Sequence, residues 1–354
     1  MLIKIFDWQK PLWWQLAGDI RKLPHAMLLG GTEGLGKLVF AQALAARLLC
    51  EQRGDADETE GLPCCECSSC RWLASGNHPD FRLIQADDGD EGDVGVEETP
   101  SARSARKPGT APIRVGQIRA LTDFVYVGSH RHGNRVVIVS PAEAMNPAAA
   151  NALLKVLEEP PTGVYFIMVS SSWRRLMPTL RSRCRNVIFG PPDASLATAW
   201  LSGEGVKKPA ELLRLAGGAP LLAVQWAEQG GLDSYRRVVE ALADKPVDPV
   251  AMAINWGAVL KTEQGFGMPQ LVEAVQKWIF DLVLIKTAGG LRYHEAWREK
   301  LRDLASRASG TGLMACYNDL LRIRAVARHP LNTQLFLEDL ATRYLRALSP
   351  ARAA

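Results

Sequence analysis

The chain has 354 residues, 47% of them apolar and 23% charged, with a formal net charge of +4. This composition suits an ordinary soluble protein of two or three domains, and the charge is too small to indicate nucleic-acid binding by itself. The first ten residues lack the basic-then-apolar layout of a signal peptide, and the longest apolar stretch near the C-terminus contains Asp281 and is too short to span a bilayer. We therefore expect a cytoplasmic protein without a membrane segment.

A phosphate-binding loop is indicated near the N-terminus. The apolar run HAMLLGG predicts a buried strand that enters a glycine-rich loop, and a helical pattern follows the loop. Gly31, Gly36 and Lys37 fit the pattern G-x-x-x-x-G-K-[S/T], whose backbone amides and lysine cradle phosphates. The next position is Leu38, where a hydroxyl would hold magnesium. Strand, loop and helix therefore predict a nucleotide-binding loop with an incomplete magnesium site.

Five of the seven cysteines lie within residues 50–70, a clustering that indicates metal binding in a reducing cytosol. Cys64, Cys67 and Cys70 have the spacing C-x-x-C-x-x-C, and Cys50 ends the preceding helical pattern. Four thiolates are the ligands of a tetrahedral structural zinc, so we predict a closed zinc site that stabilises the fold and performs no chemistry. Cys65 could replace Cys64 as a ligand, although Cys64 keeps the even spacing. The alternative to a metal site is a set of free buried thiols.

Residues 86–112 differ from the rest of the chain. They are acidic first and basic second, with Gly, Pro and Ser throughout. Because so few apolar residues can offset the entropy of ordering, we predict a disordered surface insertion, with a regulatory or binding tail as the alternative.

Two further strands and a helix between them are predicted next. Arg135–Ser140 and Val164–Ser170 are apolar runs with β-branched residues, which suit the interior strands of a parallel sheet covered on both faces. Between them, Asn146 can cap a helix, Pro147 fits its first turn, and a pair of prolines ends it.

The fold class that these patterns predict is α/β followed by all-α. A parallel-sheet domain spans residues 1–189 and includes the cysteine module at 50–70. The remaining residues have helical periodicity and no convincing strand, with glycine pairs at plausible breaks. We expect a small helical domain at 190–231 and a larger helical domain at 232–354.

Seven stretches resemble clamp-loader subunits of bacterial DNA polymerase III, which belong to the AAA+ ATPase superfamily, and most closely the delta-prime family. In chain order they are HAMLLGGTEGLGK, the cysteine module with GNHPDF, IRVGQIRAL, MNPAAANALLKVLEEPP, LMPTLRSRC, LLRLAGGAP and HPLNTQLFLEDL. The fourth is the most specific, and the match leaves only the insertion unaccounted for. The resemblance implies a RecA-like AAA+ domain with a zinc-binding knuckle, a small helical lid domain and a C-terminal helical collar domain.

The resemblance also implies a degenerate ATPase site. The ATP-hydrolysing gamma/tau subunits end the strand before the NALLK helix with Asp-Glu, where this chain has Ser140 and Pro141. Leu221 stands where those subunits place an arginine that touches the γ-phosphate. With Leu38, both magnesium groups, the water-activating carboxylate and this second sensor are missing. Lys37 could still bind phosphate weakly, or the loop could serve only folding.

The SRC stretch contains Arg183, which by resemblance is an arginine finger that reaches the γ-phosphate held by a neighbouring subunit. A planar, permanently charged guanidinium suits that role. The alternative is a surface arginine in an arginine-rich turn beside Arg181 and Arg185.

The function implied is that of a non-hydrolysing, stator-like subunit of the DNA polymerase III holoenzyme. Its partners would be the gamma/tau and delta subunits, with ATP bound by the neighbours, and it would reach the sliding clamp and primer-template DNA through the complex. One alternative is an ATP-hydrolysing, gamma/tau-like subunit. Another is a zinc-dependent nucleic-acid enzyme that would use Glu66 or His78 near the cysteines.

Overall fold

The computed structural model describes residues 4–52, 61–85, 112–126, 133–244, 248–262, 266–327 and 332–349. The chain divides into two compact units, Met1–Leu196 and Ala197–Ala354. The predicted disordered insertion lies outside the described residues apart from Pro112. The predicted division of the helical part at residue 231 stays a prediction.

A parallel five-stranded sheet forms the centre of the N-terminal unit, in the order β2-β3-β4-β1-β5. The three interior strands are buried at nearly every position, which confirms the strands predicted from apolar runs. The edge strands β2 and β5 have no counterpart among the predicted elements, because each is only four residues long and partly exposed. The strands are β1 (Ala26–Gly30), β2 (Phe81–Ile84), β3 (Arg135–Val139), β4 (Val164–Ser170) and β5 (Arg185–Ile188).

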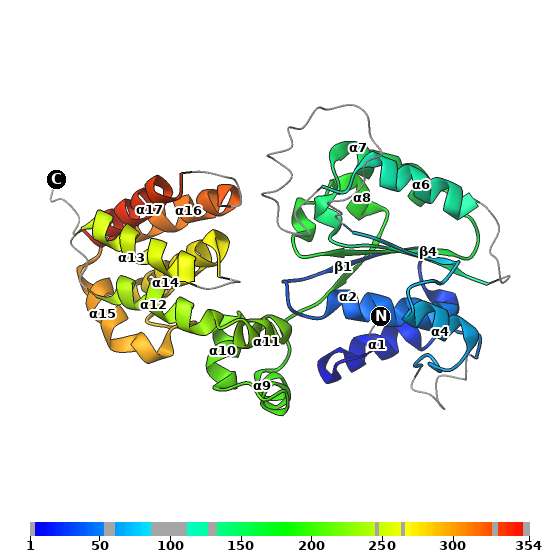
Figure 1. Ribbon diagram of the computed structural model, residues 1–354, viewed down its shortest axis with the longest axis horizontal. Helices are drawn as coiled ribbons and strands as arrows, with labels where there is room; N and C mark the ends of the chain where they lie inside the picture. The colour runs from blue at the N-terminus through cyan, green and yellow to red at the C-terminus, as the bar shows by residue number, and fades with distance from the viewer. Residues whose placement is uncertain are drawn as a thin grey trace. The chain divides into compact units, whose positions relative to one another are not determined.

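Helices cover both faces of this sheet, as a parallel sheet requires. In Figure 1, α1, α2 and α4 lie on one face and α6, α7 and α8 on the other. The helices are α1 (Lys10–Ala17), α2 (Lys37–Leu49), α4 (Ser68–Ala74), α6 (Val115–Tyr126), α7 (Pro147–Glu158) and α8 (Pro178–Ser182). The short 3-10 turns are η1 (Asp7–Gln9), η2 (Ile20–Lys22), η3 (Ala142–Ala144) and η4 (Trp173–Arg175).

Helix α7 begins as its sequence predicts. The side chain of Asn146 accepts a hydrogen bond from the backbone N–H of Ala149 at 2.7 Å, and Pro147 occupies the first turn. One side of the helix is buried through Leu153, Val156 and Leu157, against the sheet core and α8. This packing fixes the C-terminal end of α7 beside α8.

Helices make up the C-terminal unit, and no strand occurs in its described residues. The long helix α14 packs against α12, α15 and α16, while α13 packs against α17. None of the described helices is long and apolar enough to cross a membrane. The helices are α9 (Ala194–Gly203, which begins before the unit boundary), α10 (Pro209–Leu215), α11 (Pro220–Glu228), α12 (Gly231–Ala243), α13 (Pro249–Thr262), α14 (Met268–Ala288), η5 (Glu295–Trp297), α15 (Arg298–Arg307), α16 (Gly310–Val326) and α17 (Thr333–Leu348).

A buried lysine joins α14 to the end of α10. The ammonium of Lys277 donates a hydrogen bond to the carbonyl of Leu215 at 2.6 Å and lies 2.7 Å from a carboxylate oxygen of Glu273. Burial lowers the pKa of Lys277, and Glu273 acts in the opposite direction. The positive charge therefore meets both a carboxylate and the negative end of α10.

A second buried polar group lies on the same helix. Asp281 is fully buried and accepts backbone N–H groups from Arg292, Tyr293 and His294. Its Oδ2 lies 2.8 Å from Nδ1 of His294, and Nε2 of that ring lies 2.8 Å from the hydroxyl of Tyr235. Burial lowers the pKa of His294, so the neutral ring donates from Nδ1 and accepts from Tyr235. Burial opposes ionisation of Asp281, but the bonds from His294 and the backbone leave its pKa lowered.

This network predicts acid sensitivity of the C-terminal unit. The unfolded chain takes up a proton on His294 below pH about 6.5, before the folded chain does, so stability falls as pH decreases through that value. The depressed pKa of Asp281 adds a loss of the same sign at lower pH. The melting temperature of the wild type should fall between pH 7.5 and pH 5. His294→Gln should flatten that slope, and the exposed-site control Glu299→Gln should not. A slope that is the same in all three proteins would contradict the prediction.

Candidate functional site

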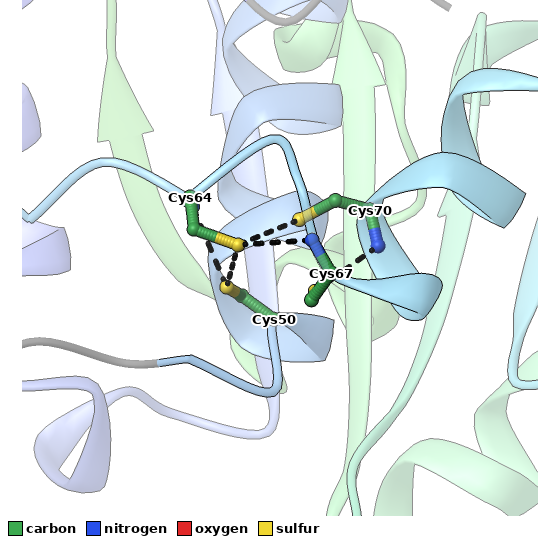
Figure 2. A group of neighbouring side chains, drawn as sticks. All are labelled: Cys50, Cys64, Cys67 and Cys70. Carbon is green, nitrogen blue, oxygen red and sulfur yellow. Dashed lines mark hydrogen bonds between the residues drawn. The ribbon is translucent and has the colours of Figure 1, made fainter.

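Four cysteines converge beside the end of α2 (Figure 2). Cys50 directly follows α2, Cys67 caps α4 and Cys70 lies within α4. All four sulfur atoms, including that of Cys64, lie within 4.8 Å of one another; Cys64 Sγ is 3.5 Å from Cys50 Sγ and 3.9 Å from Cys70 Sγ. Zn–S bonds of about 2.3 Å in a tetrahedron place sulfur atoms about 3.8 Å apart. The sulfur positions therefore fit a tetrahedral metal ion, and the separations are too long for disulfides.

Backbone amides point at these sulfur atoms. The N–H groups of Cys64, Cys67 and Cys70 donate to the sulfur atoms of Cys50, Cys64 and Cys67 at 3.4 to 3.5 Å. Burial opposes ionisation of Cys67, but the N–H groups of Glu51 and Cys70 outweigh it and lower its pKa to about 7. Burial raises the pKa of Cys50 and of Cys70. A metal ion would displace the protons from these thiols on binding.

Cys65 lies outside the cluster. It is exposed, its φ of 60° is left-handed, and its Sγ contacts the carbonyl of Pro63 at 3.5 Å. This residue turns the chain between Cys64 and Cys67, which is why its own side chain points elsewhere. The structure thus favours Cys64 over Cys65 as the fourth sulfur.

The cysteine module is tied to α2 and the sheet by a buried histidine. Ser69 Oγ donates to the carbonyl of Leu49 at 2.6 Å and lies 2.6 Å from Nε2 of His78. Nδ1 of His78 accepts the N–H of Asp80 at 3.0 Å. Both ring nitrogens are therefore engaged in structural bonds, and His78 is only 4% exposed. This arrangement does not favour a zinc-dependent enzyme with His78 as its base.

The predicted phosphate loop folds between β1 and α2. Gly36 has a φ of 80°, and a Cβ there would lie 2.7 Å from Nε2 of Gln9. That amide donates to the carbonyls of Leu35 and Gly36 at 3.0 and 3.2 Å. Gly31 also has a positive φ, and a Cβ there would lie 2.5 Å from a backbone oxygen of Phe189. Both glycines are therefore required by the packing around the loop, apart from any ligand.

Lys37 is engaged within the protein. Its ammonium donates to the carbonyl of Thr32 at 2.6 Å and to Oγ of Ser171 at 3.3 Å, and its residue is 5% exposed. Burial lowers its pKa to about 8, while the carboxylates of Glu143 and Glu33 oppose this shift. The lysine thus links the loop to the end of β4.

The positions that the resemblance marks as degenerate lie after β3, in α2 and in α11. Ser140 follows β3 directly, is buried, and donates its backbone N–H to Ile84. Leu38 is half-buried in the first turn of α2, and Leu221 is in α11. Sequence reasoning did not single out Glu143, whose Oε1 accepts the N–H groups of two serines after β4 at 2.9 and 3.1 Å. The residues around Glu143 in the sequence form no motif that would predict this contact.

Arg183 follows α8, and its side chain is 35% exposed. Its Nη1 donates to the carbonyl of Thr179 at 3.1 Å, and its Nη2 donates to a carboxylate oxygen of Glu158. The next residue, Cys184, is buried in the core of this unit, and burial raises the pKa of its thiol to about 12. Cys184 thus anchors the chain while Arg183 reaches the surface. Arg185, at the start of β5, is exposed.

Comparisons with known proteins find relatives by sequence along nearly the whole chain. The family described as "DNA polymerase III, delta subunit" matches residues 9–193. DNA polymerase III subunit delta' of Pseudomonas aeruginosa is 32% identical, covering 98% of this chain and 99% of the relative. The Escherichia coli subunit of the same name is 27% identical over 98% of this chain and 96% of its own length.

Among solved structures, a DNA polymerase III gamma subunit-related protein of Thermotoga maritima covers 96% of this chain and 99% of its own, with 18% identity and a TM-score of 0.43. The family of this chain is assigned from the sequence matches alone. The predicted fold class, a parallel-sheet domain followed by helices, is confirmed. The chain belongs to the delta-prime family of DNA polymerase III subunits.

Proposed function

We propose that this chain is a non-hydrolysing, stator-like subunit of the DNA polymerase III clamp loader and works in the bacterial cytoplasm. It assembles with the gamma/tau and delta subunits and donates Arg183 to ATP held by a neighbour, so that the sliding clamp is loaded onto primed DNA. The observation that carries this proposal is the contrast between two sites. Lys37 is buried in contacts within its own chain, whereas the guanidinium of Arg183 lies at the surface on a well-packed turn.

The chemistry of the two sites supports this division of labour. Phosphoryl transfer depends on magnesium and on groups that stabilise charge. Leu38 and Pro141 carry neither a magnesium ligand nor a base, and Ser140 has a hydroxyl where the hydrolysing subunits have a carboxylate. An arginine supplied from outside a nucleotide site can contribute about 10³- to 10⁵-fold in rate. A chain without an active site of its own can therefore still control the turnover of a neighbour.

We also propose that Cys50, Cys64, Cys67 and Cys70 hold a structural zinc ion. Four sulfur ligands close the coordination shell, so the ion would stabilise the module that joins α2 to α4 and would activate no water. The link from Ser69 and His78 would transmit that stability to the sheet.

The zinc proposal predicts different effects for adjacent cysteines. Cys64→Ser should lose most bound zinc and lower the thermal stability of the N-terminal unit, since structural zinc contributes about 10–16 kcal/mol of apparent binding energy in small domains. Cys65→Ser is the matched control and should keep one zinc ion per chain. Metal content by mass spectrometry and melting with and without a chelator measure both effects. Equal zinc content in the two variants would refute the ligand assignment.

The arginine proposal is tested in the reconstituted complex. Arg183→Ala should reduce clamp- and DNA-stimulated ATP turnover by about 10³-fold or more at the nucleotide site that it serves, because the γ-phosphate there loses a charge-stabilising partner. Arg185→Ala, an exposed arginine two residues away, should leave turnover nearly unchanged. Unchanged turnover with Arg183→Ala in a complex that still assembles would defeat the finger assignment.

The alternative of a gamma/tau-like ATPase makes the opposite prediction for the isolated chain. We expect the purified protein to show no ATP turnover above background, because the magnesium-binding and water-activating groups are absent from the expected positions. Turnover that disappears in Lys37→Ala would establish the alternative instead. A steady-state phosphate-release assay distinguishes the two.

A further inference from the structure

We propose that Glu158 is a positioning residue that holds the guanidinium of Arg183 ready for a neighbouring phosphate. This inference rests on the proposed finger function of Arg183. The carboxylate of Glu158, at the last position of α7, accepts a hydrogen bond from Nη2 of Arg183, while the carbonyl of Thr179 accepts one from Nη1. The guanidinium is therefore held at two points from two different helices.

The two contacts leave part of the guanidinium available. An arginine side chain carries five N–H donors in a rigid, planar fork. Glu158 and Thr179 engage one donor each, which leaves three for another acceptor. Because the fork is planar, fixing two of its nitrogen atoms also fixes the directions of the remaining donors. A tetrahedral phosphoryl group would meet a guanidinium that is already oriented.

Glu158 and Arg183 both lie on elements that are packed into the core of the N-terminal unit. Val156 and Leu157 bury the end of α7, and the carbonyl of Leu157 lies 3.2 Å from Nε2 of His25. On the other side, Leu180 and Cys184 flank Arg183 and belong to the same core cluster as the buried residues of α7. The backbone positions of the pair are thus set by one packed core, which is the condition for a preorganised site.

Helix stability does not explain the carboxylate at this position. The last turn of a helix presents partial negative charge, so an acidic residue there is unfavourable unless a cation compensates it. The side chains of Arg183 and Glu158 are 35% and 51% exposed, and ion pairs this exposed contribute little to folding. Orientation of the arginine is therefore the effect to which this contact is best suited.

The test uses the reconstituted complex with Glu158→Ala, Glu158→Gln and the neighbouring exposed control Glu159→Ala. Without Glu158, the Arg183 side chain has to be ordered each time the transition state forms. Glu158→Ala should therefore lower kcat by about 2- to 12-fold. KM for ATP should change little, because the neighbour binds the nucleotide. Glu158→Gln keeps an acceptor oxygen and should recover most of the rate, and Glu159→Ala should match the wild type.

A double-mutant comparison separates positioning from general damage. In an Arg183→Ala background, Glu158→Ala should have no further effect, because its action passes through the missing side chain. A full additional loss would show a structural role and overturn the inference. Normal or faster turnover with Glu158→Ala, in a complex that needs Arg183, would overturn it while leaving the finger proposal intact. If Arg183→Ala itself has no effect, both fail.

A second measurement needs only the isolated full-length chain. Nitrogen NMR of the Arg183 guanidinium should show slower hydrogen exchange and a more restricted side chain in the wild type than in Glu158→Ala. The Glu159→Ala protein should resemble the wild type. An Arg183 side chain that is equally mobile in all three proteins would overturn the inference whatever the turnover data.

Discussion

Burial of a parallel sheet on both faces is the constraint on which the N-terminal unit depends. Parallel neighbours cannot be joined by tight turns, so each connection must cross the sheet through a helix or a long segment, and all carboxyl ends meet at one edge. β1, β3 and β4 end at this edge, and the glycine loop, Ser140 and Ser171 follow them. The fold therefore brings these loops together at one edge of the sheet whatever side chains they carry.

The glycine loop shows how packing alone can require the residues of a phosphate-binding motif. Gly36 is pressed against Gln9 and Phe6, and the Gln9 amide bonds the loop carbonyls. Lys37 meets a carbonyl and a hydroxyl of its own chain. Replacing either residue would disturb the junction of α1, β1 and α2 whether or not nucleotide ever binds. A phosphate-loop pattern alone is thus weak grounds for inferring an ATPase.

Much of the fold could be predicted because its signals are local. Apolar runs gave the three interior strands, and Asn146 with Pro147 gave the start of α7. The edge strands were not predicted, because four residues with one buried side chain, as in β5, show no periodicity in the sequence. Asp281 was visible as a charge in an apolar stretch, but its partners lie eleven or more residues away and had no local signal.

The candidate sites divide in the same way. The cysteine spacing predicted the cluster but did not distinguish Cys64 from Cys65 as the fourth ligand. In the structure, the sulfur of Cys64 joins the other three, and Cys65 has a left-handed backbone and lies outside the cluster. Arg183 was predicted as a site residue from a family resemblance. Its contact with Glu158 joins residues 25 positions apart and follows only from the packing of α7 on α8. Long-range polar contacts of this kind depend on tertiary geometry, which a motif does not encode.

The lysine between α10 and α14 has a mechanical consequence. Swinging α10 away from α14 would strip the Lys277 ammonium of the Leu215 carbonyl and leave a buried charge with Glu273 as its main partner. Losing a hydrogen bond made by a charged group typically costs about 1.5–3 kcal/mol. Because that carbonyl belongs to the last residue of α10, a displacement of residues 209–215 would either break this contact or move α14 as well, so the two helices should move together.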